Sequence, residues 1–249
     1  MKIANNTFLI TGAYSGLGKA TALHLLEHNA NVVLTDIAIT KSDNNTNQCM
    51  YLTLDVTQQD QIESALHSAL DKFIRIDGLI NCAGILSSER LLKKDGSLFE
   101  LDHFRHCLEV NLTGSFNMIR LISPLLSNNP AANNKERGII INTASIAAYE
   151  GQIGQAAYAA SKAGIIGMTL PLARELAQHR IRVMTIAPGV FETALFAKIK
   201  EKQRQQLEQK TPFPNRLGKP SEYASLVQHI IENPMLNGEV IRLDGALRL

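Results

Sequence analysis

The stretch TFLITGAYSGLGKATALHLLEHN, residues 7–29, decides the fold. Its first five residues are apolar or β-branched and predict a buried strand. The glycine-rich segment TGAYSGLG (11–18) then predicts a tight turn. The residues after it place apolar side chains at helical spacing, which predicts a helix over 16–29. A strand that leads through glycines directly into a helix is the first half of a βαβ unit.

Strand-like and helical patterns alternate along the rest of the chain. The strand-like runs are continuous and apolar, which is typical of strands covered on both faces. Helical patterns lie between them, for example over 58–73. This alternation predicts an α/β fold, a Rossmann-like doubly wound parallel sheet of about seven strands with helices on both faces. The strand-like runs cover residues 7–11, 31–36, 50–55, 78–83, 138–145, 182–187 and 239–245.

The chain shows no internal repeat and no linker, so we expect a single domain over 1–249. Two polar stretches, 87–104 and 127–138, look inserted between elements. A third region, 190–218, combines a helical pattern with several prolines. It follows the carboxyl end of a predicted strand, where ligands bind in this fold class, so we predict a mobile substrate flap there.

Composition narrows the function classes. The formal net charge of +2 over 249 residues gives no support for a protein that binds nucleic acid or a membrane surface. The three cysteines and seven histidines form no metal-ligand pattern, so no metal site is predicted. No apolar run is long enough to span a bilayer. The N-terminus enters a strand almost at once and leaves no room for a targeting peptide, so we expect a cytoplasmic protein.

The glycine segment has the spacing of a dinucleotide-binding loop. Gly12, Gly16 and Gly18 would let the backbone approach a phosphate, and the helix behind them offers free N–H groups. Ser15 and Leu17 lie in the same loop. Because a strand precedes the loop and a helix follows it, we predict a single dinucleotide-binding catalytic domain.

The end of the second predicted strand indicates which dinucleotide is bound. Asp36 lies 18 residues beyond Gly18. An acidic side chain near this distance binds the ribose 2′-hydroxyl of NAD and repels the 2′-phosphate of NADP. No basic residue lies in the loop, and Ile37 follows the aspartate. We therefore predict NAD as the cofactor.

Two further strand ends lie on the same rim of the predicted sheet. Asp55 and Val56 end the third strand and are predicted to face the adenine. The segment NCAG ends the fourth strand and would let the backbone pass close to the cofactor; its predicted binding residues are Asn81, Ala83 and Gly84.

Tyr158 and Lys162 are four residues apart and share one face of a predicted helix. A phenol is a poor base at neutral pH, but a nearby cation favours its ionised form. We therefore expect Lys162, together with a positive nicotinamide, to lower the pKa of Tyr158. Ser145 ends the fifth strand and can orient a substrate oxygen. Asn111, in the helix before that strand, can hold a water that links Lys162 to solvent.

These residues, in this order, resemble the short-chain dehydrogenase/reductase family over almost the whole chain. The resemblance implies that Tyr158 is the general acid/base and that Lys162 binds the nicotinamide ribose. It also implies that Ser145 polarises the substrate oxygen and that Asn111 sustains a proton relay. Pro188 and Thr193 would border the nicotinamide.

Longer segments, such as IRVMTIAPGVF and GEVIRLDGA, resemble one group of that family, the type-2 3-hydroxyacyl-CoA dehydrogenases. The resemblance implies NAD-dependent interconversion of short-chain 3-hydroxyacyl-CoA and 3-oxoacyl-CoA, with hydroxysteroids as further substrates. It also implies a homotetramer, to which the small residues around Tyr158 would contribute close helix packing.

Several alternatives stay open at this point. An NADPH-dependent 3-oxoacyl carrier-protein reductase would have the same fold, and Asp36 argues against it. A non-catalytic dinucleotide-binding partner subunit is the other rival, and the intact catalytic residues argue against that. Gln155, three residues before Tyr158, is predicted either to bind the substrate or to cap the helix.

Overall fold

The computed structural model describes residues 1–39, 45–130, 136–193 and 201–249. The predicted parallel sheet is confirmed: seven strands pair in the order β3-β2-β1-β4-β5-β6-β7, and every pair is parallel. The strands are β1 (Thr7–Thr11), β2 (Asn31–Asp36), β3 (Cys49–Thr53), β4 (Gly78–Asn81), β5 (Gly138–Thr143), β6 (Ile181–Pro188) and β7 (Val240–Leu243).

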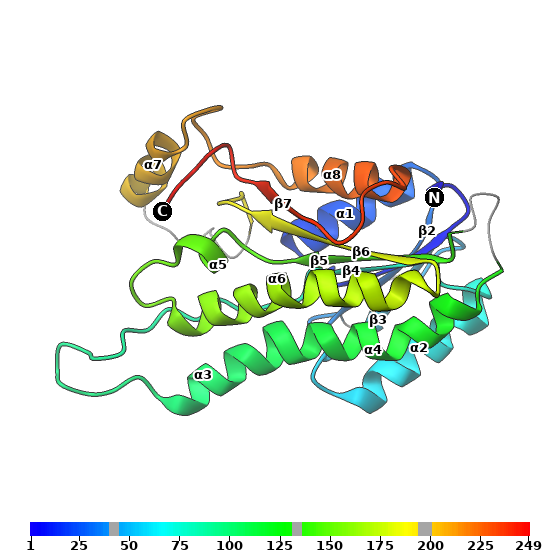
Figure 1. Cartoon of the computed structure of the whole chain (residues 1–249), viewed down its shortest axis with the longest axis horizontal. Coiled ribbons are helices and arrows are strands. Elements are labelled where there is room, and N and C mark those ends of the chain that lie inside the picture. The colour runs from blue at the N-terminus through cyan, green and yellow to red at the C-terminus, as the bar shows by residue number, and fades with distance from the viewer. Residues whose placement is uncertain (40–44, 131–135, 194–200) are drawn as a thin grey trace.

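Helices cover both faces of this sheet, as Figure 1 shows. Helices α1 and α8 lie over one face, and α2, α4 and α6 lie over the other. The helices are α1 (Gly16–Glu27), α2 (Gln59–Phe73), α3 (Leu101–Leu108), α4 (Gly114–Asn128), α5 (Ala147–Glu150), α6 (Ala156–Ala177), α7 (Glu201–Lys210) and α8 (Pro220–Glu232), with a π-helical turn, η1 (Glu109–Thr113), between α3 and α4.

The strands are continuously apolar because the sheet has a separate hydrophobic core on each of its two faces. Side chains along a strand point alternately to its two faces. In β1, Phe8 and Ile10 therefore join the core under α1 and α8, whereas Leu9 joins the core under α2, α4 and α6. All three side chains are fully buried. A strand that contributes to two cores leaves no face for polar residues.

The strand order reverses between β1 and β4. From β1 the chain goes outward to β2 and β3, and from β4 it goes outward in the opposite direction. The connections after β1 and β4 therefore diverge to opposite sides and leave a crevice at the carboxyl ends of these strands, which is where ligands bind in doubly wound sheets.

The structure corrects several predicted boundaries. Strands β4 and β5 end at Asn81 and Thr143, so residue 83 and Ser145 lie in the loops that follow them. The polar stretch 87–104 is an irregular segment only as far as residue 100, because α3 begins at Leu101. The third strand ends at Thr53, so Asp55 and Val56 lie in the loop that follows it. The polar stretch 127–138 begins within α4, which continues to Asn128.

Parts of two predicted regions lie outside the described residues. These are 131–135 of the second polar stretch and 194–200 of the predicted flap. The described part of the flap includes α7. Among the helices of the described residues, none is long and apolar enough to cross a membrane.

Candidate active site

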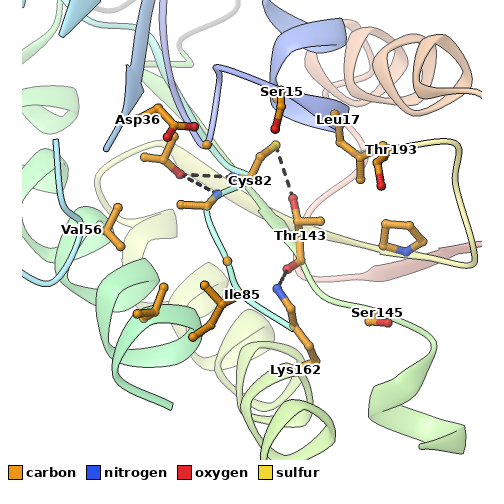
Figure 2. A pocket seen from close by; sticks show the side chains of 18 of the residues that line it. Ser15, Leu17, Asp36, Val56, Cys82, Ile85, Thr143, Ser145, Lys162 and Thr193 are labelled. Carbon is orange, nitrogen blue, oxygen red and sulfur yellow. Dashed lines mark hydrogen bonds between the residues drawn. The ribbon is translucent and has the colours of Figure 1, made fainter. Parts of the chain in front are cut away.

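A cavity of about 590 Å³ lies at the carboxyl ends of the central strands. This volume is within the range of cofactor and substrate sites. Figure 2 shows that Asp36 and Val56 lie towards one end of it, whereas Ser145, Lys162 and Thr193 lie around the other. The predicted site residues that line the cavity are Gly12, Ser15, Gly16, Leu17, Gly18, Asp36, Asp55, Val56, Ala83, Gly84, Ser145, Tyr158, Lys162, Pro188 and Thr193.

The glycine loop packs tightly against the segment that follows β4. Gly12 has a positive φ of 65°, and a Cβ atom there would lie 2.7 Å from the Ala83 nitrogen. A Cβ atom at Gly18 would overlap the carbonyl oxygen of Gly12. The hydroxyl of Thr11 accepts hydrogen bonds from the N–H groups of Cys82 and Ala83, over 3.2 and 3.1 Å. Only residues without side chains fit these two positions.

Helix α1 begins within this loop and points its N-terminus at the cavity. Its N-cap residue, Ser15, makes no side-chain capping bond. The first N–H groups of a helix have no partner within the helix, and they form a ready site for a phosphate. The loop therefore fits a pyrophosphate.

The carboxylate of Asp36 is held in place by backbone N–H groups. Tyr14 in the glycine loop donates to one oxygen over 3.2 Å, and Ala38 donates to the other over 3.0 Å. Ile37, beside it, is 72% exposed and lines the same end of the cavity. This arrangement presents a fixed negative charge where an adenine ribose would lie, and the described residues around Asp36 that line this end of the cavity include no cation.

Lys162 is buried at the other end of the cavity, with 5% of its surface exposed. Its Nζ donates a hydrogen bond of 2.8 Å to the carbonyl oxygen of Thr143 and lies 5.8 Å from the ring centre of Tyr158. Burial lowers the pKa of Lys162 to about 8, although the nearby thiols of Cys82 and Cys107 oppose this change. Most molecules still carry the charge at neutral pH.

The pKa of Tyr158 differs from the expectation. Burial raises it, and a hydrogen bond with Ser145 opposes the increase. The expected lowering by Lys162 is absent. Its ammonium group bonds to the Thr143 carbonyl and lies 5.8 Å from the centre of the phenol ring. The residues of this chain alone therefore keep Tyr158 protonated, in the form that can donate a proton.

Ser145 lies at the turn that leads into α5. Its hydroxyl accepts a hydrogen bond of 3.1 Å from the Ala147 N–H group. The N–H group of the next residue, Ile146, donates to the Pro188 carbonyl over 3.0 Å. The serine is thus held between β5 and the end of β6, beside Tyr158.

Asn111 lies in the π-helical turn η1 and is fully buried. Its amide nitrogen donates to the Ile85 carbonyl and to the Ser161 hydroxyl, each over 3.0 Å. Its amide oxygen accepts the Ile85 N–H group over 2.8 Å. The side chain therefore holds the segment after β4 against α6. The predicted water between Asn111 and Lys162 stays a prediction.

Two other predicted binding residues do not line the cavity. The side chain of Asn81 is buried beneath the rim, where its amide donates to the Oδ1 atom of Asn142 over 3.0 Å. The side chain of Gln155 turns back along the chain and accepts the Gln152 N–H group over 3.0 Å. It makes no side-chain cap for α6 either.

The cavity has further walls that the sequence reasoning missed. Cys82 lies between the predicted residues Asn81 and Ala83, and Ile85 follows Gly84. Their adjacency in the sequence could therefore have indicated that they line the cavity. His106 and Val110 precede Asn111 and are one helical turn apart, but nothing in the pattern placed that helix at the cavity. The missed lining residues are Thr11, Thr35, Ile37, Leu54, Cys82, Ile85, His106, Val110, Thr143, Ala144, Gly189 and Phe191.

No metal site accompanies these residues in the described part of the chain, where no three His, Cys, Asp or Glu side chains lie together. The cavity therefore combines a phosphate-binding loop, a fixed carboxylate and a phenol flanked by a hydroxyl and an ammonium. Such a set suits proton transfer beside a bound dinucleotide.

Comparison with known proteins agrees with this chemistry. Residues 6–204 match the family described as short chain dehydrogenase. The human protein named 3-hydroxyacyl-CoA dehydrogenase type-2 is 51% identical over 246 residues, which cover 97% of this chain and 94% of that protein.

Two solved structures share the fold. The crystal structure of 3-hydroxyacyl-CoA dehydrogenase type-2 from Mycobacterium avium has a TM-score of 0.92 and 35% identity, covering 98% of this chain and 96% of that one. The structure of 3-ketoacyl-(acyl-carrier-protein) reductase from Brucella melitensis complexed with NADH has a TM-score of 0.83 and 26% identity, covering 99% and 100%. The chain is an oxidoreductase that belongs to the short-chain dehydrogenase family and is closely related to the type-2 3-hydroxyacyl-CoA dehydrogenases.

Proposed function

We propose that this protein interconverts short-chain 3-hydroxyacyl-CoA and 3-oxoacyl-CoA, with NAD as its cofactor. One observation carries the proposal: a single cavity holds Ser145, Tyr158 and Lys162 at one end and the fixed carboxylate of Asp36 at the other. The relationship to 3-hydroxyacyl-CoA dehydrogenases supports the choice of substrate.

The side chains of this site have separate roles in the proposed reaction. Ser145 donates a hydrogen bond to the substrate oxygen and holds it beside Tyr158. In oxidation the ionised Tyr158 takes the alcohol proton, and in reduction the neutral phenol returns it. Lys162 supplies positive charge next to the phenol. The nicotinamide, when bound, accepts or donates the hydride at C3 of the acyl chain.

The preference for NAD rests on Asp36. Its oxygens already accept two backbone N–H groups, so the carboxylate cannot easily swing away from a 2′-phosphate. The 2′-hydroxyl of NAD can donate a hydrogen bond to it, whereas a phosphate would meet like charge. A structural relative was solved with the related cofactor NADH.

We also propose that the protein forms a homotetramer, and the exposed side of α6 supports this proposal. Ala156, Ala160, Ala163 and Gly167 are exposed and recur every three or four residues along one face of this helix. On the neighbouring α4, Phe116 is 45% exposed. Small residues beside an exposed aromatic side chain suit close packing of helices from two subunits.

The substrate is tested by supplying acetoacetyl-CoA with NADH or with NADPH, beside a panel of hydroxysteroids with NAD. We expect acetoacetyl-CoA reduction with NADH at a kcat/KM at least about tenfold above that with NADPH, since a charged hydrogen bond contributes about 1.5–3 kcal/mol. Equal or faster reaction with NADPH would favour a carrier-protein reductase. No turnover with either cofactor would favour a non-catalytic partner subunit.

A further inference from the structure

Strand β7 ends in a set of paired charges behind the candidate active site. Arg242 donates two hydrogen bonds to the carboxylate of Glu150, over 2.9 and 3.1 Å, and a third to Asp244 over 2.8 Å. Arg248 donates to the same oxygen of Asp244 over 3.1 Å. The guanidinium of Arg242 also lies over the ring of Tyr149, 5.0 Å from its centre. Two cations and two anions thus balance in one network.

Glu150 connects this network to the serine. It is the last residue of α5, the single turn into which Ser145 leads. The hydroxyl of Ser145 accepts the Ala147 N–H group, and its carbonyl accepts the Ala148 N–H group, each over 3.1 Å. A displacement of Glu150 would therefore move Ser145 as well.

The far end of α5 touches the helix that carries the tyrosine. A Cβ atom at Gly151 would lie 3.0 Å from the Cβ of Ala159, the residue after Tyr158. Helix α5 thus follows Ser145 at its start and reaches the helix of Tyr158 at its end, and Arg242 binds its last residue.

The same strand end also contacts the predicted flap and the residue before it, Gly189. The Gly189 N–H group donates to the Leu243 carbonyl over 2.9 Å, and a Cβ atom at Gly189 would lie 3.0 Å from the Cα of Asp244. A Cβ atom at Gly245 would lie 2.8 Å from the Phe213 carbonyl oxygen. In Figure 1 the C-terminus accordingly lies near α5 and α7.

We propose that Arg242 is a positioning residue for the reaction: through Glu150 it fixes the Ser145 hydroxyl relative to the Tyr158 hydroxyl. This inference rests on the proposed function, which assigns those two hydroxyls their roles. Ordinary exposed ion pairs contribute little to stability. This pair is different because it is bidentate, three-quarters buried and joined to a short element that ends at the active site.

The expected effect is on turnover rather than on cofactor binding. A displacement of about 1 Å between reacting groups can cost about 100-fold in rate. Removal of Arg242 should therefore lower kcat by about tenfold or more. The dissociation constant of NADH should change less than about twofold, because the predicted pyrophosphate and adenine-ribose contacts, in the loop after β1 and at Asp36 of β2, lie on the other side of the reversal in strand order.

The test compares Arg242→Ala, Glu150→Gln, the double variant and Arg242→Lys. Arg105→Ala is the matched control, because its pair with Asp102 is exposed. We expect both single variants to lower kcat, the double variant to be no slower than Arg242→Ala, and Arg242→Lys to recover part of the rate. Additive losses in the double variant, or an unchanged kcat with a lower melting temperature, would overturn the proposal.

Amide hydrogen exchange over residues 145–150 provides a second measurement. Exchange in this segment should be faster in Arg242→Ala than in the wild type, and unchanged exchange would contradict the proposed role. A wild type without turnover would count against the proposed function, whereas the exchange comparison would still test whether Arg242 holds the serine turn.

Discussion

At the scale of single residues, burial dominates the electrostatics of the site. It raises the pKa of Tyr158 and lowers the pKa of Lys162. Sequence spacing predicted that the two side chains lie together, and they do. It could not predict their pKa values, since these depend on how far the folded chain excludes water and on the Thr143 carbonyl, which accepts the lysine's hydrogen bond.

Replacement of Tyr158 tests the proton-transfer role. Tyr158→Phe removes the hydroxyl and keeps the ring, so the cavity retains its shape. We expect turnover to fall at least 100-fold, the lower range of general acid/base catalysis, while NADH still binds. Turnover within about threefold of the wild type would exclude Tyr158 from the mechanism. Tyr51→Phe, in β3 and outside the lining of the cavity, is the control.

Replacement of Lys162 tests the cost of burying its charge. Its pKa falls from an ordinary 10.5 to about 8. Between about pH 8 and pH 10.5 the folded protein has lost this proton while the unfolded chain still holds it. The unfavourable contribution of Lys162 to the free energy of unfolding therefore becomes smaller as the pH rises through this range. Lys162→Met should therefore raise the free energy of unfolding by about 3 kcal/mol more at pH 7 than at pH 10.5.

Urea denaturation of the cofactor-free protein at both pH values measures this difference. Lys94→Met is the control because Lys94 is exposed. A Lys162→Met effect that is equal at the two pH values would show that burial does not disfavour the lysine's charge.

Replacement of Asp36 tests cofactor choice. Asp36→Ala removes the like charge that would face a 2′-phosphate. We expect kcat/KM with NADH to fall by about tenfold or more and the ratio of NADPH to NADH efficiency to rise. The exposed Asp71, changed to Ala, is the control. An unchanged ratio would mean that another residue selects the cofactor.

At the scale of elements, the sequence patterns located every strand to within about two residues, which is ordinary accuracy for boundaries. The reason is that every strand contributes apolar side chains to the buried cores. Arg182 is the exception within β6, and its partners could not be read from the sequence. It is buried because its guanidinium donates to the carbonyls of Ile230 and Ile231 at the end of α8, over 2.8 and 2.9 Å.

Arg182 should therefore be important for stability. Its Nε also donates to buried Glu136 over 2.6 Å. Arg182→Ala leaves that carboxylate and the helix end without this partner, so we expect the free energy of unfolding to fall by about 3–5 kcal/mol. Urea denaturation measures it, with exposed Arg105→Ala as the control. A loss below about 1 kcal/mol would show that water replaces the guanidinium.

At the scale of the whole molecule, the doubly wound topology explains why distant residues meet. The glycine loop, the segment after β4 and the serine after β5 all follow carboxyl ends of parallel strands, so sequence alone could place them on one rim. The sequence could not predict that His106 and Phe191 line the cavity, because the approach of α3 and of the flap to the cavity depends on tertiary packing.

The exposed face of α6 offers a test of assembly. A Cβ atom at Gly167 would meet no atom within 4 Å, so Gly167→Arg should leave the subunit fold intact. In analytical ultracentrifugation we expect the wild type to have a mass four times the 27.3 kDa of the chain, and the variant to have a smaller mass. Ser64→Arg, on the exposed side of α2, is the control. A tetrameric variant would place the interface elsewhere.

The central claim is that hydride passes between NAD and C3 of an acyl-CoA within this cavity. The most direct measurement supplies acetoacetyl-CoA and NADH deuterated at both C4 positions, and determines the label in the product by mass spectrometry. The proposed function predicts 3-hydroxybutyryl-CoA with one deuterium at C3, and none formed by Tyr158→Phe on the same timescale. Product without deuterium, or no product from the wild type, would contradict it.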